Sequence, residues 1–503
     1  MATLHLPDDP HLGQLRSQAR ELQRAVRTGD ADAIAIVAEH HPKGALAEDA
    51  RTAFTLSAAQ LVIARRYGFA SWPRLKRHLD LVAEISWRPD SAAAGTVAER
   101  FVRLACLTYD DDNPAKWSTA RDLLADDPDL ADTDLYVAVT TANVSAVRRL
   151  LAADPTRASL VGGGNRWAPI FYLAYARQDP AVSEQAVLDT ARLLLDHGAD
   201  PNTGYLWHGL PSPFTLVTGC LGEGERGPVN QPEHPHGFAL ARLLLEAGAD
   251  PNDSQGLYNR MFRPGTAHLE LLFEFGLGTG DGGPWQARLG SQLQSPTEMV
   301  RGQLAWAAGH GMLDRVKLLV EHGVDVVAPL RQPGQRTQRT AIEIAALNGH
   351  SEILEFLSSL GGSQPTLSPT DAFMAAALVN DRGSVDMMIA ADPDVVTAAR
   401  DKYPSSVLRA AVLGNAGAVD LFCSLGFDVN AFGRRDVDVE QPWETALHHA
   451  AAEGDAELAR LLLTLGARTD VRDKRFDATP LEWAEHTERD AMVELLRPLT
   501  PDR

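Results

Sequence analysis

The chain has 503 residues, of which 45% are hydrophobic and 23% are charged, a composition typical of folded globular proteins. Its 67 acidic and 47 basic residues give a formal net charge of -20. This charge disfavours nucleic acid and anionic membranes as partners, and it suits a cationic or basic ligand.

Residues 1–90 are predicted to form a separate helical module. The stretch RSQARELQRAVRTGDADAIAIVAEHHP indicates two helices joined at Gly29-Asp30, because glycine ends helices and aspartate caps them. The next stretch carries the expected core of the module, which consists of Phe54, Leu61, Tyr67, Phe69, Trp72 and Leu75. Because repeats follow this segment and the end of a repeat array must be covered, we expect the module to be a cap.

Residues 91–165 are predicted to form degenerate helix pairs. Residues 132–154 (DTDLYVAVTTANVSAVRRLLAAD) keep a two-helix pattern but end in Asp-Pro rather than Gly-Ala-Asp, and residues 98–128 look like a stretched version of it. Residues 370–392, further along the chain, show the same degenerate pattern.

Residues 166–284 are predicted to hold central repeats with long insertions. ARLLLDHGADPN at 191–202 and ARLLLEAGADPN at 241–252 each place an apolar helical face before a terminating glycine. The equivalent glycines, Gly198 and Gly248, are 50 residues apart, although the repeat period is about 33. The surplus lies in a tip loop at 204–213 and in an insertion at 219–237.

Residues 285–503 are predicted to hold the C-terminal repeats. Thr445 and Thr479 begin two similar stretches 34 residues apart. Each stretch has a short first helix, a break such as Gly454, and a second helix with one apolar face. In the first stretch that face comprises Leu458, Leu461, Leu462 and Leu465, and Gly466 ends the helix.

These motifs, TALHHAA and TPLEWA followed by LLLxxGA, closely resemble the ankyrin-repeat family. The resemblance implies an all-α solenoid of stacked helix-turn-helix units in a right-handed, curved array. The N-terminal module is similar to one that opens long bacterial ankyrin repeat proteins. The segments at 230–236 (NQPEHPH), 243–252 and 257–262 (LYNRMF) resemble the same group.

The long insertions are the predicted binding site, since insertions in solenoids map to one face. Aromatic rings beside amides and carboxylates favour a specific pocket. The candidate ligand-binding residues are Tyr205, Trp207, His208, Asn230, Asp253, Tyr258, Asn259 and Arg260. The alternative interpretation is that Trp207 and Tyr258 anchor long loops and that the polar side chains are solvated.

Catalysis and metal binding are weaker alternatives at the same place. Glu223 and Glu225 could form an acid/base pair, and with His234 and His236 they are the catalytic candidates if the chain is an enzyme. Two imidazoles and a carboxylate could hold Zn²⁺ or Fe²⁺. However, the proline between the two histidines restricts their convergence, so we expect a solvated loop, no metal and no cofactor.

The expected function is non-enzymatic recognition of a protein or peptide on the concave face, which the resemblance implies. The alternative is an enzyme or small-molecule binder that uses a pocket formed by residues 204–260. Cys106, Cys220 and Cys423 are too few for a disulfide framework, no apolar run spans a bilayer, and no signal peptide is recognisable. We therefore expect a cytoplasmic monomer without nucleic-acid or membrane partners.

Overall fold

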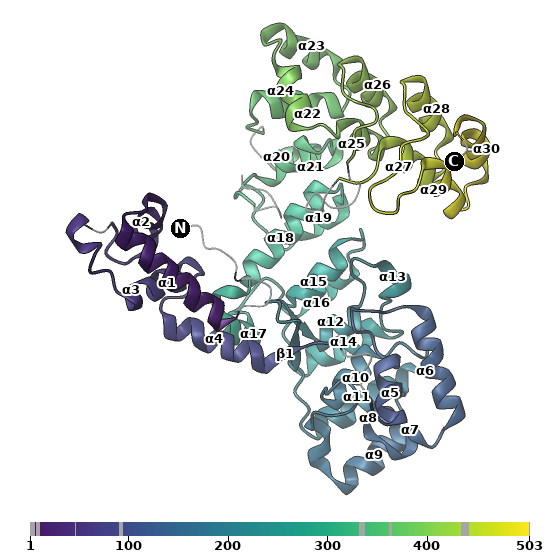
Figure 1. Ribbon diagram of the computed structural model, residues 1–503. Coiled ribbons are helices and arrows are strands. Elements are labelled where there is room, and N and C mark those ends of the chain that lie inside the picture. The colour runs from purple at the N-terminus through teal and green to yellow at the C-terminus, as the bar shows by residue number, and fades with distance from the viewer. Residues whose placement is uncertain are drawn as a thin grey trace. The chain divides into compact units, whose positions relative to one another are not determined.

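The computed structural model describes residues 6, 11–45, 47–89, 94–330, 338–361, 365–433 and 442–501. The chain divides into two compact units, an N-terminal unit (Met1–Val300) and a C-terminal unit (Arg301–Arg503), and the elements of each are labelled in Figure 1. Within the described ranges, no helix has the length and apolar character needed to cross a membrane.

The N-terminal module is a four-helix unit with its own core. It comprises α1 (Leu12–Thr28), α2 (Ala31–His40), α3 (Leu56–Arg66) and α4 (Trp72–Ile85). Gly29, with a φ of 82°, ends α1, and the Asp30 side chain accepts a hydrogen bond from the Ala33 amide to begin α2. Of the predicted core residues, Phe54, Tyr67 and Leu75 are buried, and Phe69 and Trp72 pack at the edge of the core.

The rest of the N-terminal unit consists of stacked helix pairs. Its helices are α5 (Val97–Ala105), α6 (Pro114–Asp126), α7 (Leu130–Thr133), α8 (Leu135–Thr140), α9 (Val144–Ala153), α10 (Pro169–Tyr175), α11 (Glu184–Asp196), α12 (Leu216–Leu221), α13 (Gly227–Asn230), α14 (Gly237–Glu246), α15 (Ser254–Met261), α16 (Ala267–Glu274) and α17 (Gly283–Leu289). The first helices α8, α10, α12 and α15 pack in succession, and so do the second helices α9, α11, α14 and α16. Each pair therefore buries its apolar face against its neighbours, as a solenoid requires.

The asparagine that ends each GADPN motif ties consecutive tips together. The Asn202 amide donates to the Gly248 carbonyl at 2.8 Å and accepts from the Asp250 amide at 2.9 Å. Asn252 repeats this pattern, because its side chain accepts from the Gly278 amide at 2.8 Å and donates to the Thr279 carbonyl at 3.2 Å. The recurring motif is thus a ladder of side-chain hydrogen bonds along the tips.

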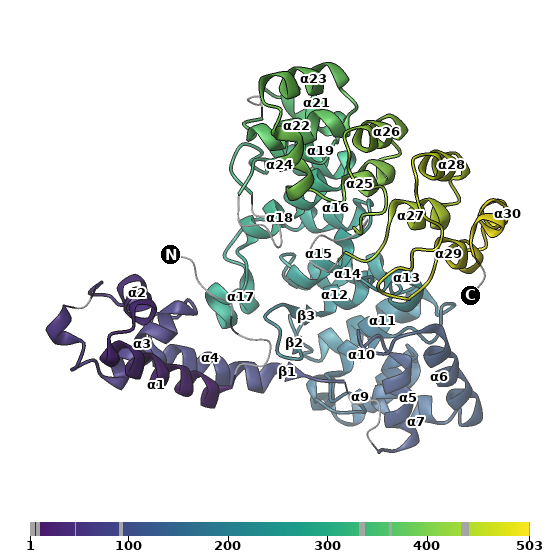
Figure 2. The same cartoon turned by 45° about the horizontal axis from the view of Figure 1, so that its top comes forward.

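A small sheet interrupts the helical pattern and was not predicted. It comprises β1 (Ser86–Trp87), β2 (Gly204–Trp207) and β3 (Pro213–Thr215), which lie side by side in Figure 2. Strand β1 pairs in parallel with β2, and β2 pairs antiparallel with β3. The predicted tip loop at 204–213 is therefore a β-hairpin, and the end of the N-terminal module covers one of its edges.

The C-terminal unit repeats the helix-pair arrangement. Helix α18 (Pro296–Gly309) crosses the boundary between the units, and it is followed by α19 (Leu313–Glu321), α20 (Ala341–Leu347), α21 (Ser351–Ser359), α22 (Pro369–Leu378), α23 (Arg382–Ala391), α24 (Val395–Lys402), α25 (Ser406–Val412), α26 (Ala416–Ser424), α27 (Ala446–Glu453), α28 (Ala456–Thr464), α29 (Pro480–His486) and α30 (Asp490–Leu496). Thr479 caps α29 with Pro480 in its first turn, and Gly454, with a φ of 77°, ends α27, as the sequence predicts.

One buried carboxylate joins several elements of the C-terminal unit. Asp371 in α22 accepts hydrogen bonds from Lys402 Nζ at 2.7 Å, from Arg339 Nη2 at 2.9 Å and from the Tyr403 hydroxyl. Burial would raise the pKa of Asp371, but these three donors lower it to about 2. Asp371 is therefore an ionised structural group at neutral pH.

Candidate functional site

The β2–β3 hairpin is anchored in an aromatic cluster through Tyr205. The Tyr205 ring stacks on Trp167 at 5.6 Å and on Phe214 at 5.7 Å, and it lies 4.8 Å from Trp87. The Trp87 indole N–H donates to the Asn165 carbonyl at 2.7 Å. Tyr205 is buried in this cluster. It therefore holds the hairpin in place and does not line the cavity described below.

The loop at 108–112 folds around a buried carboxylate. Asp112 is 0% exposed and accepts hydrogen bonds from the backbone amide and hydroxyl of Thr108, both at 3.0 Å, and from the Tyr109 amide. Lys116 Nζ lies 2.8 Å from Asp112 and 3.0 Å from Asp111. Tyr109 has a φ of 61°, a left-handed conformation that these hydrogen bonds hold.

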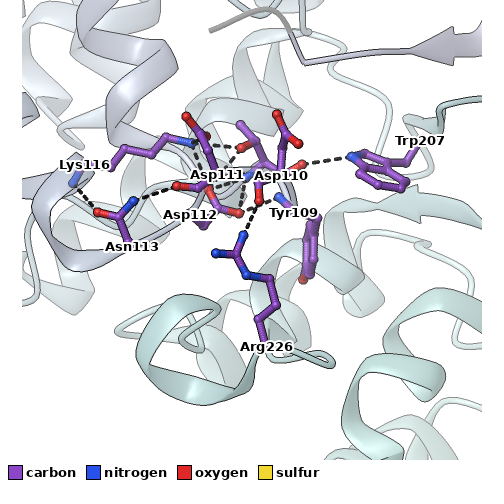
Figure 3. A network of polar contacts seen from close by, with 9 residues as sticks. Tyr109, Asp110, Asp111, Asp112, Asn113, Lys116, Trp207 and Arg226 are labelled. Carbon is purple, nitrogen blue, oxygen red and sulfur yellow. Dashed lines mark hydrogen bonds and ion pairs between the residues drawn. The ribbon is translucent and has the colours of Figure 1, made fainter. Parts of the chain in front are cut away.

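Two further side chains fix the same loop, as Figure 3 shows. The Trp207 indole N–H, at the end of β2, donates to the Thr108 carbonyl at 3.1 Å. The Arg226 guanidinium, from the insertion, donates to the Asp110 carbonyl. The hairpin, the insertion and the loop therefore form one connected wall.

These segments line a half-open cavity of about 490 Å³, within the usual size range of small-molecule sites. The 108–112 loop contributes Tyr109 to its lining. The hairpin contributes Trp207, Leu210, Pro211, Ser212 and Phe214, the insertion contributes Gly224, Glu225, Arg226 and Gln231, helix α15 contributes Ser254, Gln255, Tyr258 and Asn259, and the segment after α17 contributes Gln292, Leu293 and Gln294. The lining is thus mostly aromatic rings and amides.

Helix α15 is held beside the cavity by Asp253. This buried carboxylate caps the helix by accepting from the Gly256 amide at 2.8 Å, and it also accepts from the hydroxyls of Thr218, at 2.8 Å, and Thr215. Burial raises the pKa of Asp253. Asp253 therefore lies behind the cavity as a support for α15.

Side chains of α15 reach the other walls. The Asn259 amide donates to the Tyr109 hydroxyl at 3.0 Å and accepts from the Gln255 amide at 2.8 Å. The Tyr258 hydroxyl donates to the Glu225 carboxylate. Trp207, Tyr258 and Asn259 therefore meet at one cavity, together with Glu225.

The remaining carboxylate candidate joins an ion cluster beside the cavity. Arg260 Nη1 lies 2.9 Å from a Glu223 oxygen and 3.0 Å from a Glu233 oxygen, and it also donates to the Leu221 carbonyl. Burial raises the pKa of Glu233, and the charge of Arg260 opposes that shift. Glu223 and Glu225 therefore contact different partners, and Arg260 holds the insertion together.

The two histidines also engage separate partners. His234 is buried, which lowers its pKa, and its Nδ1 accepts from the His236 amide at 3.0 Å. His236 Nε2 contacts the Val182 carbonyl at 2.6 Å, and its Nδ1 lies 3.3 Å from a Glu184 oxygen. In the part of the chain that the structure describes, no cluster of three or more His, Cys, Asp or Glu side chains could hold a metal ion.

The last two candidate residues, His208 after β2 and Asn230 at the end of α13, are not part of the cavity lining. His208 packs against the edge of Trp207, with ring centroids 4.2 Å apart, and Asn230 donates to the Arg226 carbonyl at 3.4 Å.

The base of the insertion is held by Arg177, a buried guanidinium that donates to the carbonyls of Pro232 at 2.8 Å and Gly219 at 2.6 Å.

Several cavity residues were not singled out from the sequence. Tyr109 lies in the stretched pair at 98–128, and Gln292 and Gln294 lie after the central repeats. Gln231 lies in the NQPEHPH segment of the insertion, where Asn230 and the two histidines were the residues chosen as candidates. The run LTYDDDN at 107–113 is the one available signal, because it departs from the polar-apolar periodicity of the helices around it.

Comparison with family models places the repeats in a known class. A model described as ankyrin repeats in many copies matches residues 304–357, and a single ankyrin-repeat model matches residues 443–474. The matched residues hold the end of α18, then α19, α20 and most of α21, and further along α27 and α28. The same stacked arrangement of helix pairs recurs in the N-terminal unit. Such repeats indicate a scaffold for protein interaction. The chain therefore contains ankyrin repeats, which the family models match in its C-terminal unit.

Proposed function

We propose that the chain is a non-enzymatic scaffold that recognises a protein or peptide on the concave face formed by first helices and tips. The observation that carries this proposal is an exposed aromatic tip in the C-terminal unit. The Phe476 side chain is 61% exposed, and its ring lies 5.8 Å from Trp443 and 5.9 Å from Trp483. Exposed aromatic anchors of this kind dominate the binding energy of protein interfaces.

The tip is held rigid before any partner binds. The Asp473 carboxylate accepts hydrogen bonds from the amides of Arg475 at 2.8 Å, Phe476 at 2.6 Å and Ala478 at 3.0 Å. It also accepts from the Trp483 indole N–H at 3.0 Å. A preorganised loop loses little conformational entropy on binding, which supports its use as a recognition element.

The environment of the insertion residues supports binding over catalysis. Glu223 is paired with Arg260, Glu225 with the Tyr258 hydroxyl, and His234 with the His236 amide. A catalytic acid/base set would need these groups to converge on one reacting centre. We also propose a cytoplasmic monomer, and the three free thiols of Cys106, Cys220 and Cys423 support a reducing compartment.

Peptide selection on the full chain tests the proposal. A displayed peptide library is selected on the wild-type chain, and the enriched peptides are synthesised and titrated by calorimetry. Phe476→Ala should weaken their binding at least about tenfold, because truncating an anchor of this kind costs about 2 kcal/mol or more. The matched control is Met387→Ala in α23, which removes a 68% exposed side chain from a second helix and should leave the affinity unchanged. Equal loss in both variants, or no enriched peptide, contradicts the proposal.

A second candidate function is small-molecule binding in the cavity beside Tyr109. The cavity volume of about 490 Å³ and its aromatic lining favour it. Tyr258→Ala should abolish ligand binding while the helical circular dichroism and melting temperature stay nearly unchanged, because the Tyr258 side chain is 41% exposed. Trp207→Ala should also abolish binding, but it should loosen the 108–112 loop as well, since the Trp207 indole N–H donates to the Thr108 carbonyl. Loss of the fold in Tyr258→Ala would make that residue a structural anchor and contradict this candidate.

A further inference from the structure

We propose that the cavity lined by Tyr109, Trp207 and Tyr258 binds an uncharged ring compound that stacks on the aromatic side chains and pairs with side-chain amides. A sugar ring and a nucleobase share this chemistry, namely an apolar face and an edge with both donors and acceptors. The inference rests on the second candidate function, small-molecule binding, and names its ligand class.

The lining of the cavity carries no uncompensated charge. Of its seventeen residues, Glu225 and Arg226 are the charged ones, in a chain with 23% charged residues and a net charge of -20. They are adjacent and of opposite sign, and each has a partner, since Glu225 accepts from Tyr258 and Arg226 donates to the Asp110 carbonyl. A charged ligand would lose its hydration without gaining a counter-charge, so an uncharged ligand fits the cavity better.

The aromatic side chains offer their carbon faces. Tyr109, Phe214 and Trp207 form a continuous group, with ring centroids 4.9 Å and 6.4 Å apart in that order. The Trp207 N–H is already bonded to the Thr108 carbonyl, and the Tyr109 hydroxyl accepts from Asn259. Because these polar atoms are occupied, the rings act as stacking surfaces, which bind another ring in offset or edge-on geometry.

Two glutamines provide the polar complement. Gln231 is 4% exposed, and its amide oxygen accepts from the Arg226 backbone N–H at 3.0 Å, whereas its amide nitrogen has no hydrogen-bond partner among the described residues. The Gln255 amide nitrogen donates to Asn259, and its oxygen is likewise unpaired within the described ranges. Gln231 and Gln255 therefore present a donor and an acceptor to the cavity, which an uncharged ring with both kinds of group satisfies.

The stacking wall is preorganised. Tyr109 is held in the left-handed region by the buried Asp112, and the loop is tied to β2 and to the insertion through Trp207 and Arg226. Residues held in such conformations cluster at ligand sites. A fixed wall of this kind reduces the entropy that a small ligand must offset on binding.

Two series of probes, each with a constant ring and a varied charge, test the inference on the full chain. The sugar series is glucose, glucosamine and glucuronate, and the nucleoside series is adenosine and adenosine 5′-monophosphate. Saturation-transfer NMR and calorimetry measure binding in the millimolar range. We expect the neutral member of one series to bind and its charged counterparts to bind at least about tenfold more weakly. The series that responds identifies the ring type.

Variants show whether the probe binds in the cavity, and they distinguish failure of the ligand class from failure of small-molecule binding. Tyr258→Ala should weaken the binding of the neutral probe about tenfold. Phe476→Ala, an exposed aromatic outside the cavity, is the matched control. Tighter binding of a charged probe that Tyr258→Ala abolishes would overturn the inference and leave small-molecule binding standing. No binding of any probe would overturn both.

Discussion

The substitution Asp112→Asn tests whether one buried carboxylate organises the cavity wall. Asp112 is 0% exposed, and Lys116, which lies 2.8 Å from it, is also buried. Burial would lower the pKa of Lys116, but the charges of Asp112 and Asp111 raise it above its ordinary value. Removing one partner of a buried pair costs about 3–5 kcal/mol. Because Asp111 still lies 3.0 Å from Lys116, we expect a loss near the lower end, about 3 kcal/mol.

The control for this prediction lies in the neighbouring residue. Asp111→Asn removes the negative charge of the second carboxylate that contacts Lys116. Because the Asp111 side chain is 53% exposed, losing this ion pair should lower the free energy of unfolding by less than about 1 kcal/mol. The two variants are compared by urea unfolding that is monitored through hydrogen exchange of the backbone amides at 105–125. These amides report the stability of the loop and its neighbouring helices, separately from the C-terminal unit. Equal effects of both substitutions, or an Asp112→Asn cost below about 1 kcal/mol, would refute the assigned role.

Two further predictions concern the C-terminal unit and the hairpin. Because the folded pKa of Asp371 is about 2 and an unfolded aspartate titrates near 3.9, its contribution of about 2 kcal/mol is present above pH 4 and is lost as the pH falls towards 2. Acid unfolding of Asp371→Asn should therefore lack this dependence, and an unchanged acid profile would contradict the ion network. Gly204→Ala places a Cβ 2.7 Å from the Phe214 carbonyl oxygen, so it should destabilise the hairpin by about 1–3 kcal/mol in thermal unfolding. The control is Gly302→Ala in α18, where the added Cβ has no heavy atom within 4 Å, so the substitution should be neutral or stabilising by up to about 1 kcal/mol. A destabilised Gly302→Ala variant would show that Cβ crowding does not explain the effect at Gly204.

The repeat units could be predicted from sequence because their signals are local. Thr479 and Pro480 begin a helix and Gly454 ends one, and each effect depends on atoms within a few residues. The spacing of the leucines then assigns the buried face. The domain boundaries at 90, 165 and 284 remain predictions, although the compact units divide near residue 300.

The cavity could be predicted only in part, because its walls are distant in sequence. The insertions pointed to Trp207 and Tyr258, but Tyr109 lies about a hundred residues before Trp207, in a repeat that no motif marks. The hydrogen-bond and ion-pair partners of the polar residues in the insertion could not be predicted from the sequence either. Arg260 and Glu223 form an ion pair across 37 residues, a contact that depends on tertiary packing alone.

The β-sheet shows the same limit. Ser86 and Trp87 pair with Leu206 and Trp207 across 120 residues, and two-residue strands carry no periodic signal in the sequence. The partly buried Trp87 ring also packs against Tyr205 of β2, a second contact between the same two distant segments. Such long-range partners become visible only when the whole fold is known.

Calorimetric titration of a selected peptide into the wild-type chain, Phe476→Ala and Tyr258→Ala tests most directly whether the tip around Phe476 binds the partner. We expect Phe476→Ala to weaken peptide binding at least about tenfold and Tyr258→Ala to leave it unchanged, since the tip binds the partner and the cavity binds a separate ligand. Full peptide affinity in Phe476→Ala would contradict the proposed role of the tip.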